Sequence, residues 1–301
     1  MTYEDSILRN IDRQRTAQKA ENSQKRFERK ETLPVIERAH ARAKQIFSDR
    51  THAIQSPDFF SVYGEDGVKA DMREVIALRK RWEQKETNYD RVTKKMGDVL
   101  EAIVLVHSKQ SDWLGGADVM KTSSWDDYKN KTDMLAEWYS PEDGSRLLAL
   151  AIDVTFGKIA IEKKLKKIRE EIDRGELGSI KYFKDRRGDF MGTRNNVPRT
   201  VIGVSTGVVE ELANAWMKND DAALKDHAIQ VVLVEEILTQ LTAMQAYAKR
   251  KHKDAVVGAY QQALVVVGQL RKKKAEIPIG RLAHDPIAEE VKKKTRDVFG
   301  N

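Results

Sequence analysis

Residues 145–158 read SRLLALAIDVTFGK, an apolar run that carries one acidic side chain, Asp153. The chain as a whole is 34% charged, so a run this apolar is expected to be buried. A buried carboxylate costs free energy unless it pairs with a cation, binds a metal or takes up a proton. Asp153 is therefore a candidate for a site with a chemical function.

A second aspartate is predicted to lie beside Asp153. Residues 132–140 and 145–156 both have the composition of strands, and the sequence PEDG between them is a turn signal. A turn centred on Asp143 places Asp133 directly opposite Asp153. Facing like charges destabilise a sheet, so a bound divalent cation would account for this pair. The structural alternative is that Asp153 caps the helix that follows it.

Strand alternation assigns the two aspartates to one face of the hairpin and the large apolar side chains to the other face. A pairing slip of one residue would break this arrangement. The apolar set comprises Leu148, Leu150, Ile152 and Val154 in the second strand and Met134, Ala136 and Trp138 in the first.

The surrounding elements predict three zones. Residues 1–69 form an N-terminal helical arm that is poorly packed, with a loop at 56–67. Residues 70–221 form an α/β core, and residues 222–301 form a helical hairpin followed by a proline-containing tail. Within the core we expect, in order, a helix at 71–107, the hairpin, an amphipathic helix with Ile161, Leu165, Ile168 and Ile172 on its apolar side, strands at 179–183 and 199–205, and a helix at 207–218.

The composition limits the kinds of metal site and partner that the chain is expected to have. The chain has 301 residues, no cysteine and a net charge of +7. Without thiolates, a metal would be a hard cation held by oxygen, and the positive charge favours a polyanionic partner such as nucleic acid. No apolar run approaches the roughly 20 residues that cross a bilayer, and the first residues lack a secretory signal, so we expect a cytoplasmic protein without a membrane partner.

The stretches KNKTDML around Asp133 and AIDVT around Asp153, with a preceding helix that carries Glu101, resemble the PD-(D/E)xK nuclease superfamily, which includes restriction endonucleases and archaeal Holliday junction resolvases. The resemblance covers roughly residues 70–206. It implies a restriction-endonuclease-like mixed sheet flanked by helices, with long N- and C-terminal helical extensions. It also implies that Asp133, Asp153 and the carbonyl of Val154 bind Mg²⁺ or Mn²⁺, while Glu101 supports the metal or its water.

The chain departs from that motif at two positions. Thr132 stands where the family has proline, and Thr155 stands where it has the lysine that places a positive charge beside the attacking water. Lys158 is our first choice for a replacement, with Lys163 and Lys131 as alternatives. A degenerate member that kept the fold and lost cleavage is the other interpretation.

The mechanism that the resemblance implies is metal-assisted phosphodiester hydrolysis. Nucleic acid would then be gripped by the basic segment 184–199, unless that segment is only a solvated connector. The residues predicted for this contact are Lys184, Arg186, Arg187, Arg194 and Arg199, with Phe190 available to stack on a base.

The sequence lacks the motifs of other common catalytic and binding sites. The six histidines are scattered without an HExxH pair, and the sequence contains no Walker phosphate loop. Two functions therefore remain. One is a Mg²⁺-dependent nuclease-like protein, and the other is a non-catalytic interaction or scaffold protein whose long helices bind a partner or join the chain into a homo-oligomer.

Overall fold

The computed structural model describes residues 34–140, 144–153, 158–185 and 188–300, of which residues 140, 144–153 and 158–160 are described by their backbone alone. Val154, Thr155, Arg186, Arg187 and the predicted arm up to residue 33 lie outside the described residues. Within those ranges, no helix combines the length and the apolar character that a membrane crossing requires.

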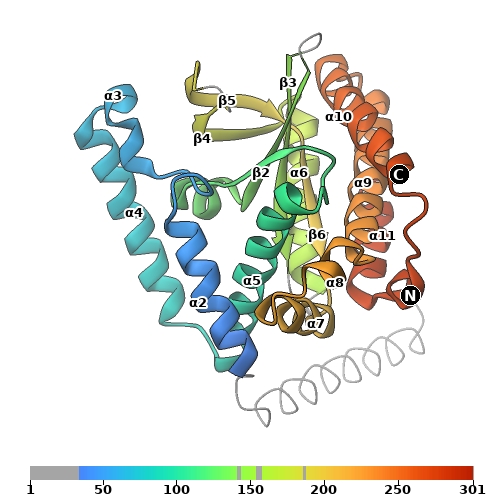
Figure 1. Cartoon of the computed structure of the whole chain (residues 1–301). Coiled ribbons are helices and arrows are strands. Elements are labelled where there is room, and N and C mark those ends of the chain that lie inside the picture. Colours follow the sequence, from blue (N-terminus) through green and yellow to red (C-terminus); the bar gives the residue numbers. More distant parts are fainter. Residues whose placement is uncertain (1–33, 141–143, 154–157, 186–187, 301) are drawn as a thin grey trace, which may run out of the picture.

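A four-stranded mixed sheet lies at the centre of the molecule (Figure 1). Its strands are β1 (Asp118–Lys121), β2 (Met134–Ser140), β3 (Gly144–Asp153) and β6 (Arg199–Gly203), in that spatial order. The pairs β1–β2 and β2–β3 are antiparallel, whereas β6 runs parallel to β3. A parallel neighbour requires a long crossover connection, and helix α6 (Lys158–Arg174) lies in it. The predicted mixed α/β architecture is confirmed.

The predicted hairpin is confirmed, but its predicted register is wrong. Ser140 pairs with Gly144 and Met134 pairs with Leu150, so Asp133 falls opposite Ala151 and not opposite Asp153. The physical reason is that Gly144 belongs to the strand and not to the turn, which moves the pairing by two residues. An even shift keeps each residue on its predicted face, because side chains alternate with a period of two.

The two helices that flank this hairpin in the sequence, α5 (Asn88–Gln110) and α6, follow from local sequence signals. Thr87 and Asp90 form a capping box that starts α5, so the predicted single helix at 71–107 is in fact α5 and a separate helix α4 (Glu65–Glu83). The amphipathic pattern of α6 is confirmed. Its apolar residues Ile161, Leu165, Ile168 and Ile172 are all buried.

A separate two-stranded sheet follows α6. Strands β4 (Gly178–Lys184) and β5 (Met191–Val197) pair antiparallel. The expectation of a connector throughout 184–199 is therefore wrong, because residues 191–197 of that segment form strand β5. Buried and exposed residues alternate poorly in β5, where residues 193–196 are all exposed. The sequence therefore lacks the period-two pattern that would have predicted this strand.

Side chains of helix α9 (Ile229–Arg250) cover the free edge of β6. The amide of Gln240 both accepts a hydrogen bond from the Val201 N–H (2.8 Å) and donates one to the Val201 carbonyl (2.6 Å). Glu236 accepts a hydrogen bond from the Gly203 N–H at 3.2 Å. Burial raises the pKa of Glu236 well above its ordinary value, and the two side chains together cover this edge with polar groups.

The remaining helices enclose the sheet. They are α2 (Pro34–Ser48), α3 (Phe60–Tyr63), α7 (Thr206–Met217), α8 (Asp221–Lys225), α10 (Asp254–Lys273) and α11 (Pro286–Phe299), with short helical turns at Ser56–Phe59, Asp126–Asn130 and Gly280–His284. The turn Asp126–Asn130, a single π-helical turn, is called η2 below. As predicted, α9 and α10 pack against each other.

Three predictions about the ends of the chain need correction. Helix α2 is well packed, with Ile36 and Ala39 buried against the core, because small and apolar residues recur on one side. The predicted loop at 56–67 is largely helical. The predicted tail contains α11, which begins at Pro286 with Asp285 as its N-cap. One buried apolar cluster includes residues of all three predicted zones, and the division into zones stays a prediction.

Candidate functional site

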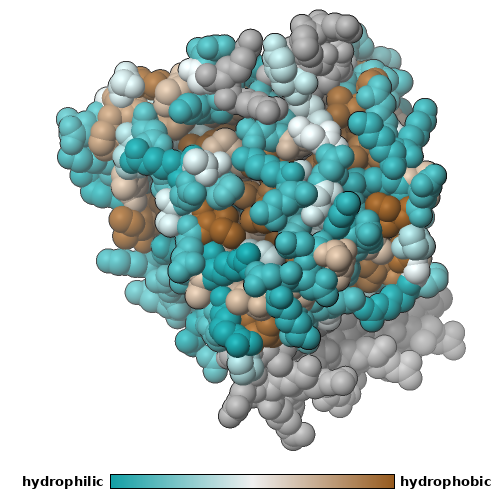
Figure 2. Space-filling model, in the orientation of Figure 1, coloured by the Kyte–Doolittle hydropathy of each residue, from teal (hydrophilic) through white to brown (hydrophobic). Residues whose placement is uncertain are grey.

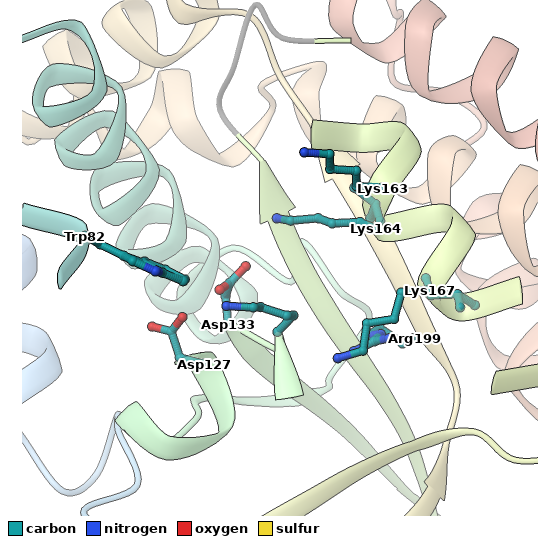
Figure 3. A pocket seen from close by; sticks show the side chains of 10 residues that line it. Trp82, Asp127, Asp133, Lys163, Lys164, Lys167 and Arg199 are labelled. Atoms are coloured by element: carbon teal, nitrogen blue, oxygen red, sulfur yellow. The ribbon is translucent and has the colours of Figure 1, made fainter. Parts of the chain in front are cut away.

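A pocket of about 550 Å³ opens where α6, β6 and the segment before β2 meet (Figure 3). One wall, called the acid wall below, consists of Trp82, Asp127, Lys131 and Asp133. The facing wall, called the basic wall, consists of Lys163, Lys164, Lys167, Ile168, Arg199 and Val201. The pocket therefore brings the predicted carboxylate Asp133 together with a concentration of positive charge.

The acid wall rests on a buried aspartate within η2. Asp126 is 0% exposed and accepts hydrogen bonds from Ser123 Oγ (2.8 Å), Asn130 Nδ2 (2.7 Å) and the backbone N–H groups of Lys181 (2.7 Å) and Tyr182 (3.1 Å). Burial raises the pKa of Asp126, while these hydrogen bonds oppose the rise by favouring the charged form. The segment before β2 is thereby tied to strand β4.

The chain leaves η2 through a constrained turn. Lys131 has a positive φ of 58°, a left-handed conformation that is uncommon outside glycine and asparagine. The hydroxyl of Thr122 then donates to the Thr132 carbonyl at 2.5 Å, and the Thr122 N–H donates to the Asp133 carbonyl at 3.1 Å. Strained backbone of this kind is often found at functional sites. The turn fixes the backbone of Asp133 at the start of β2.

A buried ion pair lies beside the acid wall. The ammonium of Lys121 lies 2.5 Å from Glu101 and 3.3 Å from Asp127. Burial, reinforced by the charges of Asp133 and other nearby aspartates, raises the pKa of Glu101 to about 8 against the opposing effect of Lys121. Burial alone would lower the pKa of Lys121. The carboxylates around this lysine nevertheless hold its pKa well above the ordinary value.

The basic wall comes mainly from one side of α6. Lys163, Lys164 and Lys167 have the spacing that places residues on the same side of a helix, and Figure 3 shows their side chains directed toward the pocket. Burial, followed by the charge of Arg199, lowers the pKa of Lys167. Arg199 itself is 4% exposed, and its Nη2 donates to both carboxylate oxygens of Glu171, at 2.8 and 3.0 Å.

The structure brings together only some of the predicted site residues. Asp133, Arg199, Lys163 and Lys131 line the pocket, whereas Glu101 lies behind the acid wall through its contact with Lys121. Lys158 and Asp153 are placed by their backbone alone, at the start of α6 and the end of β3. Lys184, Arg194 and Phe190 are exposed residues of the β4–β5 hairpin and are not among the residues that line the pocket.

Sequence reasoning missed several lining residues. Asp127 belongs to an acidic pair six positions before Asp133, a signal that could have been found. Lys164 and Lys167 share the predicted side of Lys163, and helical spacing also indicated them. Trp82 gave no such signal, because α4 is distant from the motif in the sequence.

Within the part of the chain whose side chains are described, no group of three or more histidine or acidic side chains lies close enough together to hold a metal. Asp127 and Asp133 are two carboxylates on one wall. Mg²⁺ commonly uses one or two protein carboxylates and completes its shell with water and substrate phosphate, so the donor types fit that ion.

Comparison of the chain with protein-family models, with curated proteins and with solved structures found no match.

Proposed function

We propose that the pocket binds the phosphodiester backbone of nucleic acid and that the chain hydrolyses it in a Mg²⁺-dependent reaction. The observation that carries this proposal is the arrangement of the two walls. A carboxylate pair, Asp127 and Asp133, faces three lysines of α6 across one cavity. Phosphodiester chemistry needs both kinds of group, because the phosphate is anionic and its hydrolysis develops further negative charge.

The lysines of the basic wall supply the phosphate contact. Lys163 is exposed, and Lys164 and Lys167 are half-buried, so their ammonium groups can reach a ligand while their carbon chains line the cavity. Lysine acts as a flexible point charge that adapts to a phosphate. Arg199 has a different part in this proposal, because its ion pair with Glu171 holds the wall itself in place.

The acid wall supplies the candidate metal ligands. Asp133 stands immediately before β2, and the end of β3 with Asp153 lies on the neighbouring strand, two positions beyond the residue opposite Asp133. Mg²⁺ held by Asp127 and Asp133, with Asp153 as a further candidate ligand, would polarise the phosphate and lower the pKa of a bound water. Hydrolysis forms a new bond between phosphorus and the water oxygen, which gives up one proton to the surrounding water, and the bond to the leaving oxygen breaks as that oxygen takes up a proton.

The chain offers a local proton donor for that step. Burial lowers the pKa of Lys131, and the nearby Lys167 and Lys164 lower it further, while Asp127 opposes the shift. An ammonium group with a lowered pKa releases its proton more readily. Because Lys131 also lines the pocket on the same wall as Asp133, we assign this lysine to the leaving oxygen.

The order of elements supports a restriction-endonuclease-like core as the finer description of the fold. Helix α5 carries Glu101, the β2–β3 hairpin carries Asp133 and Asp153 near its open end, and the amphipathic α6 follows. This is the plan on which the resemblance to the PD-(D/E)xK superfamily rests. The additional parallel strand β6 completes a compact mixed sheet.

The test is a cleavage assay on labelled DNA and RNA, each single-stranded and duplex, with Mg²⁺, with Mn²⁺ and with a chelator. We expect wild-type cleavage that the chelator abolishes. Asp133→Asn should lower the rate by at least about a hundredfold, since it removes a ligand charge at the reacting phosphate. The matched control is Asp254→Asn, an exposed acidic residue of α10 outside the pocket lining, which should cleave normally.

The same samples separate binding from cleavage. Wild-type protein that binds nucleic acid but does not cleave it with either metal would exclude hydrolysis and favour a degenerate nuclease-like protein. Equal cleavage by the wild type and Asp133→Asn would contradict the assignment of Asp133.

A further inference from the structure

An exposed tryptophan that stacks on a half-buried tyrosine stands at the pocket. Trp82, at the end of α4, is 47% exposed and belongs to none of the buried apolar clusters of the described residues. Its ring stacks on Tyr128 of η2, with centroids 5.3 Å apart and an interplanar angle of 29°. Tryptophan carries a large and rigid apolar surface, and about half of the surface of Trp82 is open to solvent beside the pocket.

The surroundings of Trp82 match the chemistry of a nucleotide. The ring lines the same cavity as Asp133 and the lysines of α6, and Figure 3 shows it at the side of the pocket opposite those lysines. The Lys131 ammonium lies 4.2 Å from the Trp82 ring centroid. An aromatic surface beside cations is the combination that binds single-stranded nucleic acid, because bases stack on rings and phosphates pair with the cations.

We infer that the Trp82–Tyr128 pair receives an unpaired nucleobase whose adjoining phosphate lies against the basic wall. This inference rests on the proposed function and specifies its substrate as nucleic acid that is single-stranded, or locally unpaired, at the site. A base inside a duplex has both faces covered by its neighbours, so only an unstacked base can reach the ring. Lys131 is flexible enough to move from the ring to a phosphate as the base enters.

The chain contains a matched exposed aromatic residue for comparison. Phe190 is 43% exposed, close to the value for Trp82, and its ring lies 6.0 Å from Phe183 on the β4–β5 hairpin. It is not among the residues that line the pocket.

Figure 2 shows that apolar residues also gather over the side of the molecule where α4 lies in Figure 1. The exposed Val62, Met72 and Ile76 belong to α3 and α4. Of these exposed apolar residues, only Trp82 lines the pocket.

The experiment measures the affinity of the full chain for labelled oligonucleotides by fluorescence anisotropy in the presence of a chelator. The ligands are a single strand, its blunt duplex and a single strand of abasic nucleotides, each as DNA, with the single strand repeated as RNA. The proteins are wild type, Trp82→Ala, Trp82→Phe, Phe190→Ala and the double variant Lys163→Ala/Lys164→Ala, each checked for folding by circular dichroism.

We expect Trp82→Ala to weaken single-strand binding about tenfold, the loss of roughly one stacked base. Duplex and abasic binding should stay within about twofold of wild type, since neither ligand offers a base to the ring. Trp82→Phe should restore most of the loss. Phe190→Ala, at the stacking position predicted from the sequence, should weaken single-strand binding by less than Trp82→Ala does. Binding of the single strand should also quench wild-type tryptophan fluorescence more than that of Trp82→Phe.

Two results would overturn the inference and identify what failed. If Trp82→Ala binds the single strand as wild type does, or weakens the single strand and the abasic strand equally, base stacking is wrong. In that case, a loss of binding in the double lysine variant would leave the proposed function standing. If the wild type binds none of the ligands, the proposed function and this inference both fall.

Discussion

The two walls of the pocket are held in opposite ways. Behind the acid wall, Asp126 is fully buried with four hydrogen bonds to its carboxylate, and the mostly buried ammonium of Lys121 contacts Glu101 and Asp127. In the basic wall, Lys163 is exposed and ends a long flexible side chain. The difference indicates that the backbone carrying the carboxylates is fixed before a ligand arrives, whereas the lysine side chains of α6 adjust to it. Preorganised charge lowers a barrier most where it does not have to move.

The largest expected effect comes from removing Asp126, the buried aspartate that supports the acid wall. Asp126→Ala leaves two buried backbone N–H groups without an acceptor, so we expect the free energy of unfolding to fall by about 4 kcal/mol. The neighbouring Asp127→Ala should cost at most about 1 kcal/mol, because its half-exposed carboxylate is partly solvated. Urea denaturation of the two variants measures both. Equal losses would show that the wall is not organised around Asp126.

The second test uses pH to examine the buried carboxyl behind the wall. Glu101 has a pKa of about 8 in the folded chain against an ordinary value of 4.5, so the folded state binds more protons between these values. Stability should therefore be greatest below about pH 4.5 for this group and fall as pH rises towards 8. Urea titrations at several pH values should find that wild type loses stability relative to Glu101→Gln across this window. A constant difference between the two would contradict the raised pKa.

The third test addresses the flexible wall. Lys163→Ala/Lys164→Ala should weaken nucleic-acid binding about tenfold and reduce the salt dependence of the affinity by about 1.5 in the log–log slope, with little change in stability. Lys166→Ala is the matched control, because Lys166 lies on the same helix but is exposed and paired with Glu162. Anisotropy at several salt concentrations measures both. If Lys166→Ala has the same effect as the double variant, α6 binds through its general charge and not through the pocket.

The smallest expected effect concerns the turn that leads to Asp133. At a φ of 58°, glycine suits the backbone of position 131 better than alanine does. Lys131→Gly should therefore be more stable than Lys131→Ala by about 1 kcal/mol, the reverse of their order in a helix. Thermal unfolding compares the two. If Lys131→Ala proves the more stable, this turn does not constrain the acid wall.

Local patterns predicted the elements that carry the site, and tertiary contacts determined the rest. Alternation and the PEDG turn gave the hairpin, and the spacing of Ile161, Leu165 and Ile168 gave the buried side of α6. The register needed the pairing of Gly144, which composition cannot supply. Trp82 reaches the pocket from a helix outside the motif, and Asp126 is buried because strand β4, distant in sequence, donates to it.

Gly203 links the sheet to a helix that is synthesised much later. A side chain at this position would place its Cβ 2.7 Å from Ile287 and from Val291, so the absence of one lets α11 pack directly against β6. The strand that completes the sheet is therefore made long before its cover. During translation, we expect one face of β6 to stay exposed to solvent until residues 286–299 have emerged from the ribosome. We therefore expect the pocket between α6 and β6 to reach its final form only after most of the chain has been synthesised.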